Sequence, residues 1–196
     1  MQNNLEFVTD GSVVYRLGGN DWYAVEQDED KVMLVDTDCK VANEELKSPW
    51  SNGNCCSEDG ENGQAILDYC NNLINTYFGS IKHAVVPRNV AAGTGKIESA
   101  YIWPMSFKEF ASNRSVGDKL IEDANSSVWT RTFSGIYNDV CSAWYGNVDV
   151  ESLGANYNVN NVFLVAPAFY LKKSAIDHVT EDGEIVLKLA KTDITD

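Results

Sequence analysis

The residues best suited to recognition or chemistry gather in one late stretch of the chain, residues 134–161. This stretch interleaves aromatic side chains with asparagine, aspartate and serine. Tyrosine and tryptophan give a large, rigid contact area, and asparagine and serine give adaptable hydrogen bonds. The same asparagine, aspartate and glycine residues also favour turns, so a purely connecting role stays open. The candidate ligand-binding residues are Tyr137, Asn138, Asp139, Trp144, Tyr145, Asn147, Asn156, Tyr157, Asn158 and Asn160.

Cysteine and histidine are too scattered to predict a metal site. The five cysteines contain no C-x-x-C spacing, and the two histidines, His83 and His178, lie far apart in sequence. A structural zinc site needs four well-spaced ligands. The vicinal pair Cys55 and Cys56 could act as a redox switch, but free thiols in a reducing compartment are the favoured interpretation. Calcium would need several oxygen ligands, for which the late stretch offers Asn138, Asp139, Asn147 and Asp149. We favour a recognition surface without calcium over this calcium site. We therefore predict neither a metal nor a cofactor.

No set of catalytic residues is recognisable in the sequence. A nucleophile–His–acid triad would have to use His83 or His178, and neither is flanked by a catalytic motif. The run Gly-Thr-Gly-Lys at 93–96 invites a phosphate-binding interpretation. It lacks the four residues between the glycines, and the Ser or Thr after the Lys, that a P-loop requires. We therefore predict that the chain is not an enzyme.

Charge and composition exclude several classes of partner. The 196 residues carry a formal net charge of −14, and 44% of them are hydrophobic. The chain is therefore apolar enough to fold, and its charge repels phosphate backbones and anionic lipid surfaces. The charge could also serve solubility alone. The sequence has neither a signal-peptide pattern nor a run of about 20 apolar residues. We expect one domain over 1–196, cytoplasmic when made, with nucleic acid and membrane excluded as partners.

Hydrophobic patterning predicts the elements that would position the late stretch. Residues 1–43 are expected to form an N-terminal β-meander from the runs LEFVT, SVVYRL, DWYAVEQ and KVMLVDT, separated by turn residues. Residues 44–63 are polar and turn-rich, which predicts a long loop. Apolar residues at helical spacing predict a core-facing helix over 66–78, with Gly79 as its C-terminal cap.

Shorter elements are expected in the rest of the chain. The segments KHAVVPRNV and AYIW predict short strands around the loop AAGTGK. Ser106 and Glu109 have the spacing of a capping box, and a second helix is expected to begin near Ser115. FLVAPAFYL predicts a late strand. In the tail, residues 173–196, a turn at 181–183 precedes a closing strand, EIVLKLA.

Four side chains in these elements have expected structural roles. Trp103 and Trp129 are large enough to anchor the core. Arg131 lies between two threonines on a predicted strand, and we expect it at the surface or half-buried beside an acidic residue. Glu109 is assigned, with its capping partner, to starting a helix and not to chemistry.

Four segments occur in an order that resembles the C-type-lectin-like fold: GQAILDYCNNLINTYF, AYIWPMSFKEF, VWTRTF and FLVAPAFYL. The resemblance is to the version of the fold shared by formylglycine-generating-enzyme-like proteins and by uncharacterised modules of gut bacteria and their phages. It spans roughly residues 60–172. In those modules a final strand with a Val-Arg-Pro-Ala-Leu pattern closes the core. Here Val165 and Ala166 replace the Val-Arg pair, so any contact made by that arginine is lost.

The resemblance implies an α+β fold with a C-type-lectin-like core, an N-terminal β-meander and two or three helices. It also implies ligand binding through the long loops between the late strands. The family's calcium-dependent sugar-binding triplets are absent, and only Cys141 lies where formylglycine-generating enzymes carry their cysteines. Some proteins of this fold are diversified by retroelements that mutate asparagine codons, and residues 137–161 resemble such a region. An even spread of substitutions along the gene in sister isolates would contradict that hypothesis.

These observations together predict a non-enzymatic recognition module. It would bind a protein or glycan receptor through its late loops, as part of a phage or another mobile element. The alternative is a structural or assembly protein of a phage particle, either as a homo-oligomer or among other virion subunits. Neighbouring genes for tail parts or for a reverse transcriptase would discriminate between the two.

Overall fold

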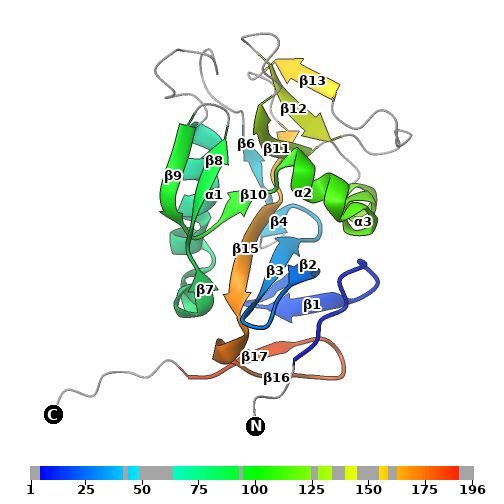
Figure 1. The fold of residues 1–196 in the computed structure, drawn as a ribbon, viewed down its shortest axis with the longest axis vertical. Helices are drawn as coiled ribbons and strands as arrows, with labels where there is room; N and C mark the ends of the chain where they lie inside the picture. The colour runs from blue at the N-terminus through cyan, green and yellow to red at the C-terminus, as the bar shows by residue number, and fades with distance from the viewer. Residues whose placement is uncertain are drawn as a thin grey trace, which may run out of the picture.

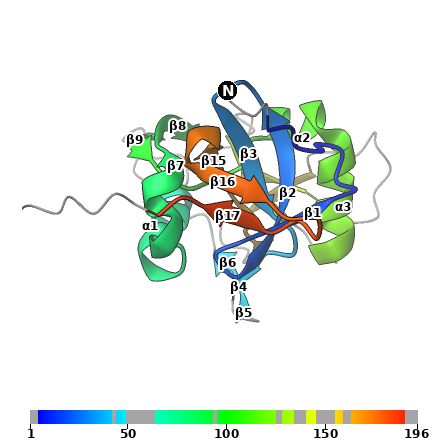
Figure 2. The same ribbon diagram turned by 90° about the horizontal axis from the view of Figure 1, so that it is seen from below.

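The computed structural model describes residues 5–41, 44–48, 64–92, 95–124, 128–133, 140–144, 155–158 and 163–189. The fold is mixed α+β, as predicted, with two main sheets flanked by helices (Figure 1). The view from below shows α1 and α3 on opposite sides of the first sheet (Figure 2).

The first sheet joins the N-terminal strands to a late strand of the chain. Its strands are β1 (Val14–Leu17), β2 (Asn20–Gln27), β3 (Lys31–Asp36), β15 (Pro167–Lys172), β10 (Trp103–Pro104) and β7 (Val85–Val86). The order is β1-β2-β3-β15-β10, with β7 also paired to β15, and every pair is antiparallel. Strand β15 therefore holds the N-terminal meander to the middle of the chain.

The turns of the meander follow the predicted residues. Gly18 and Gly19 connect β1 to β2 with φ angles of 64° and 82°. Positive φ at both central residues is the requirement of the tightest hairpin turn. Between β2 and β3, one carboxylate oxygen of Asp28 accepts the backbone N–H groups of Asp30 and Lys31, each at 2.9 Å. These turns fix the antiparallel register of the three strands.

The predicted first strand, LEFVT, is wrong: residues 5–9 form no strand. Their backbone bonds to side chains instead of a neighbouring strand. Phe7 donates its N–H to Gln27 Oε1 and accepts from Gln27 Nε2, at 3.1 and 2.7 Å. The N–H of Val8 donates to the hydroxyl of Tyr15 at 2.8 Å. Since these partners satisfy the backbone, the segment needs no strand ladder.

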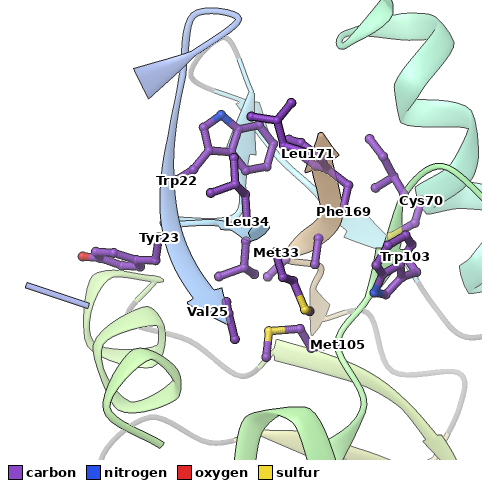
Figure 3. Close-up of a cluster of buried hydrophobic side chains, with 14 of the residues drawn as sticks. Trp22, Tyr23, Val25, Met33, Leu34, Cys70, Trp103, Met105, Phe169 and Leu171 are labelled. Atoms are coloured by element: carbon purple, nitrogen blue, oxygen red, sulfur yellow. The ribbon is translucent and has the colours of Figure 1, made fainter. Parts of the chain in front are cut away.

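The core cluster joins the first sheet to α1 and also to α2 and α3 (Figure 3). Strand β3 is buried from its second residue to its last. Trp22 packs edge-on against Phe169 and Phe78, with ring centroids 4.9 and 5.3 Å apart. Its indole N–H donates to the carbonyl of Leu17 at 2.9 Å, so burial leaves no unpaired donor there.

The α-helices lie where the sequence predicts them, with one wrong cap, whereas the 3-10 helix was not predicted. They are α1 (Gln64–Thr76), the 3-10 helix η1 (Gly79–Ala84), α2 (Phe107–Ser112) and α3 (Arg114–Ala124). Gly79 does not cap α1 in the left-handed conformation; it begins η1, and the N–H of Phe78 bonds to the carbonyl of Leu73. Within the described ranges, no helix is long and apolar enough to cross a membrane.

The second sheet stands above the first in Figure 1 and carries the late strands. It consists of β13 (Ala155–Asn158), β12 (Val140–Trp144), β11 (Val128–Phe133), β14 (Phe163–Leu164) and β6 (Lys47–Ser48), in that order. The predicted strand FLVAPAFYL is split between the two sheets, as β14 and β15. The N–H of Val165 bonds to the carbonyl of Leu46, which turns the chain from one sheet toward the other.

The predicted loop over 44–63 is wrong at its start, where short strands occur, and small hairpins complete the fold. Besides β6, it contains β5 (Glu44–Glu45), which pairs with β4 (Lys40–Val41). Residues 49–63 lie outside the described part. Strands β8 (Arg88–Ala92) and β9 (Gly95–Ala100) form a hairpin where KHAVVPRNV and AAGTGK occur. The first residues of KHAVVPRNV belong to η1 and not to a strand.

The closing hairpin covers the outer edge of β1. It follows the short 3-10 helix η3 (Lys173–Ala175) and consists of β16 (Ile176–Val179) and β17 (Ile185–Leu187). The N–H of Arg16 donates to the carbonyl of Gly183 at 2.9 Å. Gly183 has a φ of 87°, and a Cβ there would lie 2.5 Å from the carbonyl oxygen of Val14. Only glycine fits this contact between hairpin and sheet.

We expect Gly183→Ala to lower the free energy of unfolding by at least about 2 kcal/mol, because it adds a backbone clash to an unfavourable φ. Gly19→Ala is the matched control, since Gly19 has a φ of 82° and a Cβ added there would meet no atom within 4 Å. That variant should lose only about 1 kcal/mol. Urea unfolding of both variants measures the difference, and equal losses would contradict the close contact.

Candidate functional site

The structure places four of the predicted ligand-binding residues on two neighbouring strands. Trp144 ends β12 opposite Val128, and the register pairs Asn156 with Ser142, Tyr157 with Cys141 and Asn158 with Val140. The remaining candidates lie outside the described residues: Tyr137, Asn138, Asp139, Tyr145, Asn147 and Asn160. Asp149, the fourth calcium candidate, also lies outside them.

A buried ion pair fastens the second sheet to α2. The Nη1 and Nη2 atoms of Arg131, on β11, lie 2.7 Å from the two carboxylate oxygens of Glu109. Only 9% of the Arg131 side chain is exposed, so this pair is largely shielded from water. The backbone N–H of Arg131 also donates to the carbonyl of Met105 at 3.1 Å. Arg131 is thus paired with an acid, as predicted, but it is buried more deeply than the predicted surface or half-buried position.

Glu109 is held in place by the start of its own helix. The predicted capping box is confirmed: the N–H of Glu109 donates to Ser106 Oγ at 3.1 Å, and the N–H of Ser106 donates to Glu109 Oε2 at 2.7 Å. The same carboxylate therefore caps α2 and accepts from Arg131. The sequence interpretation of Glu109 as a cap alone was incomplete.

Arg88 is the second cation on this carboxylate. Its Nη2 lies 3.0 Å from Glu109 Oε1, and its Nη1 lies 3.4 Å from the hydroxyl of Tyr170. The guanidinium carbon sits 4.5 Å from the ring centroid of Trp103 and 5.4 Å from that of Tyr170. Guanidinium groups stack favourably on aromatic faces. These contacts fix the Arg88 side chain, of which 27% is exposed.

The Tyr170 hydroxyl links this cluster to the first sheet. It donates a hydrogen bond to Glu26 on β2. Burial, followed by the hydrogen bond to Glu26, raises the pKa of Tyr170 to about 12. The phenol therefore stays protonated at neutral pH and acts as a donor.

Two guanidinium groups meet a single carboxylate at Glu109. Glu109 accepts four hydrogen bonds, two from Arg131 and one each from Arg88 and the Ser106 N–H. A carboxylate offers about four such positions, so Glu109 is saturated. Burial lowers the pKa of Arg131 while Glu109 raises it, and a guanidinium remains charged in either case. Two cations thus share one anion.

A pocket opens beside this cluster. Its volume is about 360 Å³. Its ionisable lining residues are Glu26, Arg88, Lys108, Glu109, Arg131 and Tyr170, and its neutral polar ones are Ser106, Ser112 and Asn113. They come from β2, β8, β11, β15 and the α2 region. Such a polar hollow can bind a small hydrogen-bonding ligand.

Sequence reasoning missed most of this pocket. Arg131, Ser106 and Glu109 were singled out, but for structural roles only. Arg88 and Tyr170 lie in ordinary strand sequence, with no local motif to mark them. The one usable signal was Trp103: it was predicted as a core anchor, is fully buried, and supplies the ring beneath a guanidinium. The side chain of Trp129 is not among those described.

The other potential chemical groups do not line this pocket. Cys39 and Cys70 are buried, and burial raises the pKa of both thiols. Cys55 and Cys56 lie outside the described residues. Exposed His178 has its Nδ1 2.9 Å from Asp177 Oδ2 on the closing hairpin. Among the described residues, no group of three or more His, Cys, Asp or Glu could hold a metal ion.

Asp36, at the end of β3, is a buried carboxyl with a pKa raised to about 7. Burial is the main cause, with the nearby charge of Asp38 second. One oxygen accepts the N–H groups of Asp38 and Lys40, at 3.3 and 3.2 Å. The folded protein therefore keeps a proton on Asp36 that the unfolded chain loses at lower pH.

Asp36→Asn should stabilise the protein relative to wild type increasingly as the pH rises from about 4 to about 7. In this window the raised pKa makes the wild type lose stability with pH, since its folded state binds the extra proton. A pKa of about 7 against the ordinary 3.8 limits the effect to at most about 4 kcal/mol. Urea unfolding of both proteins across the window tests this, and a difference that does not change with pH would refute it.

Comparison of the chain with protein-family models, with curated proteins and with solved structures found no match. The function of this chain has to be inferred from its own contacts, charges and strand order.

Proposed function

We propose that this chain is a non-enzymatic recognition module that binds a protein or glycan receptor through its second sheet. The binding surface would comprise β12, β13 and the segments that join the late strands. The observation that carries the proposal is the buried pair of Arg131 and Glu109. This pair attaches β11, the central strand of the second sheet, to α2. A rigid scaffold that carries a polar and aromatic surface is the usual arrangement of a recognition module.

The position of β12 and β13 supports this proposal. Figure 1 shows them at the end of the molecule opposite the closing hairpin β16–β17. Among the described strands, β13 pairs only with β12. Its sequence, Ala-Asn-Tyr-Asn, brings asparagine and tyrosine to that edge. An edge strand offers backbone N–H and C=O groups to a partner in addition to its side chains.

The chemistry of the best-formed polar cluster favours binding over catalysis. Glu109 already accepts four hydrogen bonds, so it has no free position from which to take a proton. The thiols of Cys39 and Cys70 are buried with a raised pKa, which suppresses the reactive thiolate. These side chains are therefore suited to structural roles.

The strand order supports the further proposal of a C-type-lectin-like core. The late strand β15 lies between the N-terminal β3 and the mid-chain β10, and α-helices flank the sheet. A second sheet then forms largely from the late strands. The asparagine- and tyrosine-rich stretch 137–161 is the basis for extending the proposal to a phage or another mobile element.

Replacing Tyr137, Trp144, Tyr145 and Tyr157 together by Ala should weaken receptor binding at least about tenfold, since aromatic anchors supply most of the energy of such surfaces. The purified protein would be tested on a glycan array and on a panel of bacterial cell surfaces. Tyr77→Ala is the control, because Tyr77 is an exposed aromatic next to α1, 39% accessible and outside the proposed surface.

Equal binding by wild type and a folded fourfold variant would contradict the proposed surface. Binding lost equally in the Tyr77→Ala control would also contradict it. If wild type binds no glycan and no cell surface, the receptor proposal fails and a particle-assembly role becomes the better explanation.

A further inference from the structure

Arg88 keeps hydrogen-bond donors that the described residues do not use. Its Nη2 serves Glu109, but its Nη1 contact with the Tyr170 hydroxyl is long, at 3.4 Å. Its Nε atom is buried and has no hydrogen-bond partner among the described residues, and the same holds for Nε of Arg131. Buried donors are normally paired. Because both Nε atoms are buried, an acceptor in the adjoining pocket would bond to the terminal nitrogens of Arg88, of which Nη1 makes only the long contact with Tyr170.

The pocket has the opposite sign of charge from the protein as a whole. Its lining includes three cationic side chains, those of Arg88, Lys108 and Arg131, against two carboxylates, those of Glu26 and Glu109. One positive charge is therefore in excess, although the whole chain carries −14. Lys108 is exposed at the pocket and has no carboxylate partner among the described residues. A ligand with one negative charge would balance this site.

The size and polarity of the pocket narrow the ligand further. About 360 Å³ is near the lower limit for small-molecule sites and suits one sugar ring. The ring of Tyr170 is flanked by Arg88 and by Lys31, whose Nζ lies 5.1 Å from its centroid, so little aromatic face is left for an apolar ligand. Ser112, Asn113 and Glu26 instead offer donors and acceptors to hydroxyl groups.

We propose that this pocket binds a single sugar residue that carries a carboxylate, of the size of a hexuronate. The carboxylate accepts hydrogen bonds from Arg88 and from the ammonium of Lys108, and the ring hydroxyls bond to Glu26, Ser112 and Asn113. A hydrogen bond between a guanidinium and a carboxylate is charge-assisted and strong, which gives Arg88 the leading role beside Lys108. The site lies apart from β12 and β13, so it does not depend on the proposed late-strand surface.

The test is a titration of the isotope-labelled full chain followed by nuclear magnetic resonance. Glucuronate is the probe, glucose has the same ring without the carboxylate, and acetate has the carboxylate without the ring. Glucuronate should give saturable shifts of the Arg88 Nε–H signal and of the backbone amides of residues 106–113. Glucose and acetate should each bind at least about tenfold more weakly, because each lacks one half of the recognised chemistry.

Two substitutions probe the assignment of the charges. Lys108→Glu reverses an exposed charge at the pocket without touching the core, and it should abolish the glucuronate shifts. Arg88→Gln should weaken binding at least about tenfold, and the first variant keeps the test decisive if this one fails to fold. Arg114→Gln is the control: Arg114 is an exposed arginine on α3 outside the pocket, and its loss should leave binding unchanged.

The proposal is overturned if glucuronate gives no saturable shift at these residues, or if glucose or acetate binds as tightly as glucuronate. Unchanged binding in the folded Lys108→Glu variant would overturn it as well. The fourfold alanine variant of the late strands should bind glucuronate as wild type does. The pocket and the late-strand surface can therefore fail independently of each other.

Discussion

Arg131 and Glu109 form a bidentate ion pair in a position where water scarcely reaches, and this pair joins the second sheet to α2. The arginine comes from β11, the central strand of the second sheet. The glutamate comes from the first turn of α2, directly after β10 of the first sheet. Because Glu109 also closes the capping box with Ser106, its carboxylate is oriented by its own helix as well as by the arginine. One side chain thus sets both the start of a helix and the position of a strand.

Burying two charged side chains costs desolvation free energy, which their mutual attraction must offset. A buried ion pair often contributes little net stability compared with apolar side chains of similar size, whereas breaking one is expensive. Its effect here is to specify which strand lies beside α2. Arg88 joins as a second cation and is fixed by Trp103, Tyr170 and Glu109. The lining of the adjoining pocket has one positive charge more than its carboxylates balance, and Arg88 keeps hydrogen-bond donors that are poorly used. The pocket is therefore suited to an anion.

Local signals allowed much of the fold to be predicted. The glycines at 18 and 19, the capping box of Ser106 and Glu109, and the apolar spacing of α1 each act within a few residues, and the structure confirms them. The strand predicted over 5–9 is wrong because that backbone bonds to the side chains of Gln27 and Tyr15, which sequence patterns do not reveal. The late strand is split for a similar reason, a long-range bond from Val165 to Leu46.

The pocket could be predicted only in part. Glu109 and Arg131 lie in recognisable local patterns. Arg88, by contrast, lies 21 residues before Glu109 on another hairpin. Tyr170 and Glu26 meet only because β15 returns to the N-terminal meander; they are 144 residues apart in sequence. Such contacts follow from topology and leave no local signal. The predicted late-strand residues stay a prediction, since most of them lie outside the described part of the chain.

The most direct test of this account is a double-mutant cycle on the free energy of unfolding with Arg131→Met, Glu109→Gln and the double variant. If the pair holds the second sheet to α2, each single substitution costs about 3–5 kcal/mol. The double variant should then cost less than the sum of the two by more than about 1 kcal/mol, because the residues act as a unit. Additive losses, or single losses below about 1 kcal/mol, would contradict the central role of the pair.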